Sequence, residues 1–140
     1  MDLLLMNDPV VDTQADLLAV GILAGKPPQL PQALLDRMGE GLSELVKSEK
    51  FVAKAESTLA LPTLGKLGAP HLLLVGLGEG EPDQIRSAAG AVGQAARKKG
   101  AEKVAIDFGV VQDKVPAALM VEGFGAGNYA FDRHKAESKR

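Results

Sequence analysis

One segment limits the possible folds more than any other. Between residues 71 and 108 an apolar run, a glycine turn, a long amphipathic stretch and a second apolar run follow one another. The runs HLLLVGL at 71–77 and KVAIDF at 103–108 are typical of buried strands. Pro82 suits the first turn of a helix, and Arg97-Lys98-Lys99-Gly100 is a basic last turn with a glycine stop. A strand–helix–strand unit of this length predicts parallel neighbouring strands.

Three more apolar runs predict further strands. Residues 3–6 (LLLM) and 17–23 (LLAVGIL) are bounded by turn formers, and the second is apolar throughout, as in a strand covered on both faces. Residues 57–64 (STLALPTL) predict an edge strand, because Pro62 has no N–H to donate inside a sheet. We expect these strands and the hairpin that leads into residue 71 to add antiparallel pairings to the parallel unit.

Helical periodicity appears in two other places. In residues 31–50 the apolar side chains fall on one stripe, and Gly39 and Gly41 weaken the middle, so two shorter helices meeting near Gly41 are an alternative to one. Pro116 opens a further predicted helix through residues 119–131. The sequence therefore predicts an α/β fold, a mixed and mostly parallel sheet with helices on both faces.

Composition narrows the function classes. The 140 residues fit one domain, which we place at 1–132, with 133–140 as the charged start of a linker. There is no cysteine, which rules out disulfides and thiolate chemistry. The net charge of −2 and the diluted basic tail do not favour nucleic acid, and no apolar run is long enough to span a membrane. We expect a cytoplasmic protein.

The glycine turn has two interpretations, a phosphate cradle or a packing turn. Residues 76–80 read G-x-G-x-G, but Glu81 stands where a dinucleotide fingerprint needs its third glycine, and Asp107 follows at the end of the next strand. Glu79, Glu81 and Asp83 place carboxylates at the positive end of the helix dipole, where they would repel a phosphate. The sequence favours the packing turn.

The remaining polar residues do not assemble an active site. Asp8, Asp12 and Asp16 recur every four residues, but Pro9 argues against a helix there, so we expect solvated or capping aspartates. His71 and His134 are the only histidines, and neither has a second ligand at metal spacing. We therefore predict no catalytic, cofactor-binding or metal-ligating residue in this chain.

Ordered stretches of the chain resemble one known family. Residues 72–108, LLLVGLGEGEPDQIRSAAGAVGQAARKKGAEKVAIDF, resemble the centre of the N-terminal domain of leucyl aminopeptidases, the cytosol aminopeptidase family. The ending at 121–140, VEGFGAGNYAFDRHKAESKR, is similar to the close of that domain, with its Y-x-F-D-R-x-K pattern. ADLLAVGIL at 15–23 resembles an early strand of the family. The resemblance runs from about Ala15 to Lys139.

The resemblance implies a three-layer α/β/α fold like that of macro domains. It also implies a larger catalytic domain that carries two divalent metals, Zn or Mn, held by a lysine and several carboxylates, and a signature of the type N-T-D-A-E-G-R. No such signature occurs in these residues, so no catalytic role is carried over to any position.

On this reading the chain is a non-catalytic domain that supports assembly and active-site access in a homohexameric metalloexopeptidase. Its partners are then its own catalytic domain and sister subunits, with peptides bound only through the catalytic domain. The alternative is a stand-alone macro-like module that binds ADP-ribose or a nucleotide.

Overall fold

The computed structural model describes residues 2–6, 14–108, 121 and 123–125. Within them the chain forms one five-stranded sheet in the order β1-β5-β2-β4-β3. The elements in chain order are β1 (Asp2–Met6), β2 (Leu17–Ile22), α1 (Gln32–Met38), α2 (Glu40–Ser48), β3 (Thr58–Pro62), β4 (His71–Gly76), α3 (Pro82–Lys99) and β5 (Lys103–Asp107).

Four of the five strands are parallel. β5 pairs with β1 on one side and with β2 on the other, β2 pairs with β4, and only β3 runs antiparallel, to β4. The expectation that the two early strands add antiparallel pairings is therefore wrong for β1 and β2. The reason is that β5 lies between β1 and β2, so these sequence neighbours are not sheet neighbours and no hairpin joins them.

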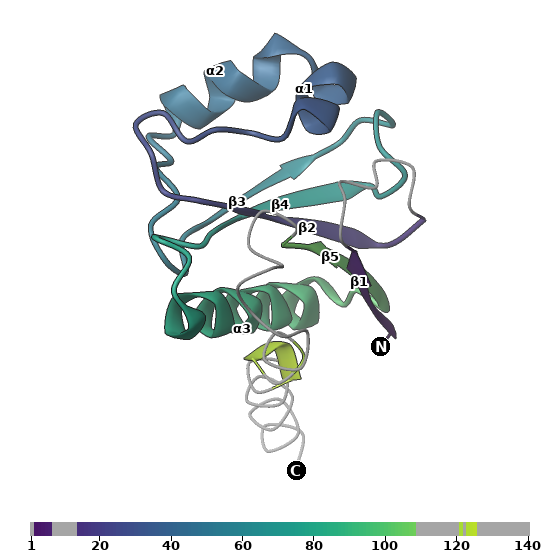
Figure 1. Ribbon diagram of the computed structural model, residues 1–140. Coiled ribbons are helices and arrows are strands. Elements are labelled where there is room, and N and C mark those ends of the chain that lie inside the picture. The colour runs from purple at the N-terminus through teal and green to yellow at the C-terminus, as the bar shows by residue number, and fades with distance from the viewer. Residues whose placement is uncertain (1, 7–13, 109–120, 122, 126–140) are drawn as a thin grey trace.

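The sheet is the middle of three layers, which confirms the predicted α/β/α architecture. Figure 1 shows α1 and α2 on one face of the sheet and α3 on the other. A hydrophobic core lies on each face of the sheet, and alternate residues of β2 pack into one or the other. Leu17 and Ala19 pack on the α3 side. Leu18, Val20 and Ile22 pack on the α1–α2 side. This alternation follows from the two-residue period of a strand.

The helices begin and end where the local chemistry changes. The predicted 31–50 segment forms two helices, which was the alternative to one, and the break falls at Gly39, which has φ +80° and lies just before Gly41. Gly39 adopts the left-handed region that side chains disfavour, whereas Gly41 continues α2. α3 starts with Pro82 in its first turn and ends at Gly100 in the αL conformation, as the sequence predicts.

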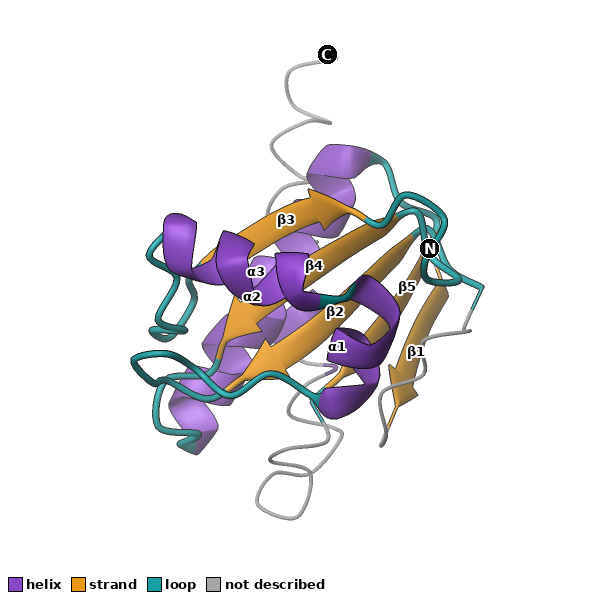
Figure 2. Ribbon diagram, turned by 90° about the horizontal axis from the view of Figure 1, so that it is seen from above, coloured by secondary structure: helices purple, strands orange, loops and turns teal. Residues whose placement is uncertain are grey.

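β3 forms one edge of the sheet and contains Pro62, as predicted (Figure 2). Of the helix predicted after Pro116, residues 121 and 123–125 are helical, and Gly123 lies against the backbone carbonyl of Arg86 on α3. The rest of that helix and the predicted linker at 133–140 lie outside the described residues.

Candidate functional site

The glycine turn between β4 and α3 donates all its backbone N–H groups within the protein. The N–H of Leu77 donates to the carbonyl of Ile22 (2.8 Å), that of Gly78 to Ala53 (3.1 Å) and that of Gly80 to Leu77 (3.0 Å). The N–H groups of Glu79 and Glu81 both donate to Oε1 of Gln84, each at 3.1 Å. A phosphate at a helix N-terminus needs free amides, and the run from residue 77 to 81 offers none.

The first turn of α3 is closed by its own side chains. The Glu81 side chain accepts the N–H of Gln84, and the Gln84 side chain accepts the N–H of Glu81, which is a capping box. Asp83 adds a further carboxylate in the first turn. Negative side chains therefore occupy the positive end of the helix dipole. The structure agrees with the sequence argument that this is a packing turn.

Close backbone packing explains the glycines of the turn. A Cβ on Gly76 would collide with the backbone carbonyls of Lys54 and Ala53, so only glycine lets the two segments approach. Gly78 has φ +60° and lies beneath the Gln84 side chain. Its carbonyl accepts the N–H of Ala24 at 2.8 Å, which joins the loops that follow β2 and β4. Backbone hydrogen bonds thus close this end of the sheet between the two strands.

A hollow of about 650 Å³ remains beside the carboxyl end of β2. It is lined by Gly21, Ile22, Leu23, Ala24, Gly25, Pro27, Gln29, Leu30, Pro31 and Gln32. Carboxyl ends of parallel strands are the usual position for ligands in open α/β sheets. None of these described lining residues carries a charge, so the wall provides neither a cation for a diphosphate nor an acid–base pair.

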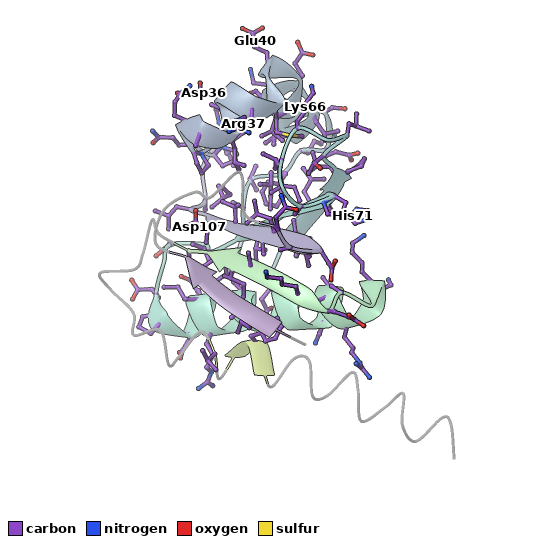
Figure 3. The ribbon with its side chains drawn as sticks, turned by 90° about the vertical axis from the view of Figure 1, so that its right-hand side faces the viewer. Asp36, Arg37, Glu40, Lys66, His71 and Asp107 are labelled. Carbon is purple, nitrogen blue, oxygen red and sulfur yellow. The ribbon has the colours of Figure 1, made fainter. Side chains whose placement is uncertain are left out.

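Asp107 and His71, which the sequence places at the ends of two predicted strands, do not meet. Asp107 ends β5, pairs in register with Val20 of β2 and is only 3% exposed. His71 is exposed at the start of β4. Figure 3 shows the two at opposite ends of the sheet. Asp107 is not among the residues that line the hollow beside β2, so it does not take the ribose-binding position of a dinucleotide site.

Asp16 has a structural role, as expected of a capping aspartate. Its Oδ2 accepts the N–H groups of Glu102 and Lys103, both at 2.9 Å, just before β5 begins. These backbone hydrogen bonds hold the pKa of Asp16 below its ordinary value of 3.8. The carboxylate thus joins the entries of β2 and β5. Asp8, Asp12 and His134 lie outside the described residues.

Metal clusters and membrane-spanning helices are both absent from the part of the chain that the structure describes. There, no three His, Asp or Glu side chains come together in a way that could hold a metal ion. The described helices also include none that is long and apolar enough to cross a membrane.

Sequence reasoning missed one residue that decides the character of the turn. Gln84 accepts two amides and so completes the closure of the glycine loop. The signal was present in the sequence as Glu81-x-x-Gln84, the spacing of a capping box.

Comparison with known proteins confirms the family resemblance over most of the chain. Residues 19–138 match the family model of the cytosol aminopeptidase family, N-terminal domain. A "Probable cytosol aminopeptidase" of Geotalea uraniireducens is 38% identical over 105 residues, which cover 71% of this chain and 21% of that protein. A second one, from Alkaliphilus metalliredigens, is 28% identical over 96% of this chain and 29% of its own length. The chain thus spans less than a third of the length of these relatives.

Solved structures show the same fold. The tomato leucine aminopeptidase mutant K354E superposes with a TM-score of 0.68 at 22% identity, covering 94% of this chain and 28% of that one. A macrodomain of Trypanosoma brucei in complex with ADP gives a TM-score of 0.63 at 18% identity, covering 95% of this chain and 59% of that one. At these identities the likenesses establish a macro-domain-like fold and nothing further. The family match over residues 19–138 and the shared fold together show that the chain belongs to the cytosol aminopeptidase family, as its N-terminal domain.

Proposed function

We propose that this chain is the non-catalytic N-terminal domain of a cytoplasmic, metal-dependent exopeptidase that removes N-terminal amino acids, and that it supports oligomer assembly and controls access to the active sites. The match of residues 19–138 to the family's N-terminal domain carries this proposal. The parent enzyme would be a homohexamer whose two divalent metals, Zn or Mn, are held by a separate catalytic domain. Those metals would polarise the peptide carbonyl and activate water there.

The closed turn between β4 and α3 supports a scaffold role. The amides from residue 77 to 81 are used within the protein, and the neighbouring hollow has an uncharged lining. Catalytic and binding sites require polar groups directed at a ligand. In the turn between β4 and α3 the amides are instead bonded to backbone carbonyls and to the Gln84 side chain.

The decisive assay compares two proteins. The 140-residue chain should hydrolyse leucine p-nitroanilide no faster than the blank, with or without added Mn²⁺ or Zn²⁺. The same chain expressed together with the reading frame downstream of residue 140 should hydrolyse it in a metal-dependent way. Hydrolysis by the 140-residue chain alone would overturn the proposal.

A stand-alone module for ADP-ribose or a nucleotide is the second candidate. It is favoured by the fold shared with the ADP-bound macrodomain and by the hollow of about 650 Å³ at the carboxyl end of β2. The engaged amides and the absence of charge in the described lining weigh against it. Calorimetric titration with ADP-ribose should give no heat of binding, and micromolar affinity would make this candidate the better one.

A further inference from the structure

The outer edge of β3 is chemically unusual for an exposed edge. The strand reads TLALP: it is short and ends in a proline, which limits pairing at that end, but it carries none of the charged residues that commonly protect an exposed edge. In the described part of the chain no strand lies beyond β3 (Figure 2). The unpaired N–H and C=O groups on the outer side of an uncharged edge are a template for pairing with another strand.

The register of β3 on β4 shows which backbone groups point outward. The N–H of Gly76 donates to Ser57, and the N–H of Thr63 donates to Pro70, so residues 57 and 63 face β4. Because bonded positions alternate along an antiparallel pair, Leu59 and Leu61 also face β4, and Thr58, Ala60 and Pro62 face outward. Pro62 is tolerated because its missing N–H lies on the outer side.

A second copy of the chain fits this edge by symmetry. If two β3 strands pair antiparallel about a two-fold axis at Leu59, Thr58 of each copy lies opposite Ala60 of the other. Both residues face outward, so their N–H and C=O groups form four hydrogen bonds across the axis. Leu59 then lies opposite Leu59 of the second copy. Pro62 falls just beyond the four bonds, where its lack of an N–H costs none of them.

The charges beside the edge match the same register. A groove of about 630 Å³ runs between β3 and α3, with Leu73, Ala91 and Ala95 among its lining residues. Glu56 lines it near the Gly76 end of β4, whereas Lys98 and Lys99 line it on the last turn of α3, near His71. An axis perpendicular to the sheet keeps both α3 helices on one face. Glu56 of each copy therefore lies opposite Pro62 of the other copy. This places the Glu56 carboxylate beside the end of the groove where Lys98 and Lys99 of the other copy lie.

We propose that this chain self-associates through its β3 edges into a two-fold dimer with one continuous sheet, held by four backbone hydrogen bonds and by contacts of Glu56 with Lys98 and Lys99 of the second copy. The inference deepens the assembly role proposed above and rests on it. It specifies the partner as an identical β3 edge and the interface as isologous.

Amide hydrogen exchange tests the backbone part directly. We expect the amides of Thr58 and Ala60 to be slow to exchange in concentrated solution and fast in dilute solution, because only dimerisation covers them. The amides of Leu59 and Leu61 are the internal control: they face β4 and should be protected at both concentrations. Thr58 and Ala60 amides whose exchange does not depend on concentration would overturn the proposal.

Charge reversal tests the side-chain part by analytical ultracentrifugation. Glu56→Lys alone, and Lys98→Glu with Lys99→Glu, should each weaken the dimer about tenfold, because the ion pairs of a two-fold interface are lost twice. The variant that carries all three substitutions should regain the dimer affinity of the parent, because the opposite charges face one another again. Glu40→Lys makes the same charge change on an exposed residue of α2, away from β3, and should leave the dimer unchanged. Failure of the combined variant to restore association would overturn the proposed register.

The outcomes also separate this inference from the assembly role. A chain that is monomeric at every concentration, or that dimerises without covering Thr58 and Ala60, refutes the β3 interface. The assembly role itself fails only if the longer protein assembles equally well after residues 1–132 are removed.

Discussion

At the scale of single residues, a few side chains hold segments that are far apart in sequence. Asp16 lies just before β2, yet its carboxylate accepts the N–H groups of Glu102 and Lys103 at the start of β5. Gly76 has a comparable effect on the opposite end of the sheet, where the lack of a side chain lets the Lys54 carbonyl approach. Both residues therefore have structural roles.

Replacing Asp16 should lower stability in a pH-dependent way. The backbone bonds hold its pKa in the folded chain below 3.8, so its stabilising contribution is complete above that value and is lost as the pH falls through the folded-state pKa. The urea midpoint of Asp16→Ala should therefore lie below that of the parent at neutral pH, and the difference should shrink below pH 3.8. Asp16→Asn keeps an acceptor oxygen without the charge and should be intermediate. A difference that grows on acidification would contradict the assignment.

Two glycine-to-alanine substitutions should have opposite effects. In Gly76→Ala the new methyl group would collide with backbone, which flexible side chains cannot relieve, so we expect a loss of about 2–3 kcal/mol in the free energy of unfolding. Gly41→Ala places the methyl in open space on α2 and should raise stability by about 0.5–1 kcal/mol. Denaturant unfolding followed by far-UV circular dichroism measures both. Equal effects would show that packing at Gly76 is not the constraint.

At the scale of elements, the start of α3 determines what this end of the sheet can do. Gln84 accepts the amides of Glu79 and Glu81, and Glu81 caps the helix in return. The same strand–turn–helix geometry that presents amides to phosphate in nucleotide-binding proteins is here satisfied internally. Local capping, rather than the strand–turn–helix geometry itself, therefore separates a binding loop from a packing loop.

Removing the Gln84 acceptor should destabilise the helix start. Gln84→Ala leaves two N–H groups without their side-chain partner, and we expect a loss of about 1 kcal/mol in the free energy of unfolding. Gln84→Glu retains the acceptor oxygen and an acidic first turn, so it should keep most of the stability. Thermal and urea unfolding of the two variants make the comparison. An alanine variant as stable as the parent would show that the capping contributes nothing.

At the scale of the whole molecule, one sheet couples two cores. Leu17 and Ala19 of β2 belong to the core under α3, and Leu18, Val20 and Ile22 of the same strand belong to the core under α1 and α2. Neither layer can lose its packing without disturbing a strand that the other layer needs. The domain should therefore unfold as a single cooperative unit.

A cavity in one core should consequently weaken both. Leu34 on α1 is fully buried, and Leu34→Ala should reduce the free energy of unfolding by about 2–4 kcal/mol. Hydrogen exchange in the native state should show the same loss of protection in the slowest amides of α3 as in those of α1 and α2. Loss of protection confined to α1 and α2 would mean that the two layers unfold separately.

The sequence by itself determined the elements and the character of the glycine turn. Apolar runs, Pro82 and Gly100 placed β4, α3 and β5, and the carboxylates around residue 81 predicted a packing turn; these depend on local patterns of burial, capping and charge. Pro62 likewise predicted the edge position of β3, because proline lacks a donor.

Only the tertiary structure decided how distant segments meet. The insertion of β5 between β1 and β2 made the early strands parallel, and the break between α1 and α2 fell at Gly39 because of its backbone conformation. Two sets of hydrogen bonds also could not be predicted: Asp16 accepts the N–H groups at the start of β5, and the carbonyl of Ala53 accepts the N–H of Gly78. Such contacts join residues that no local sequence pattern relates. Short-range periodicity encodes what each segment becomes, but pairing partners depend on the packing of the whole chain.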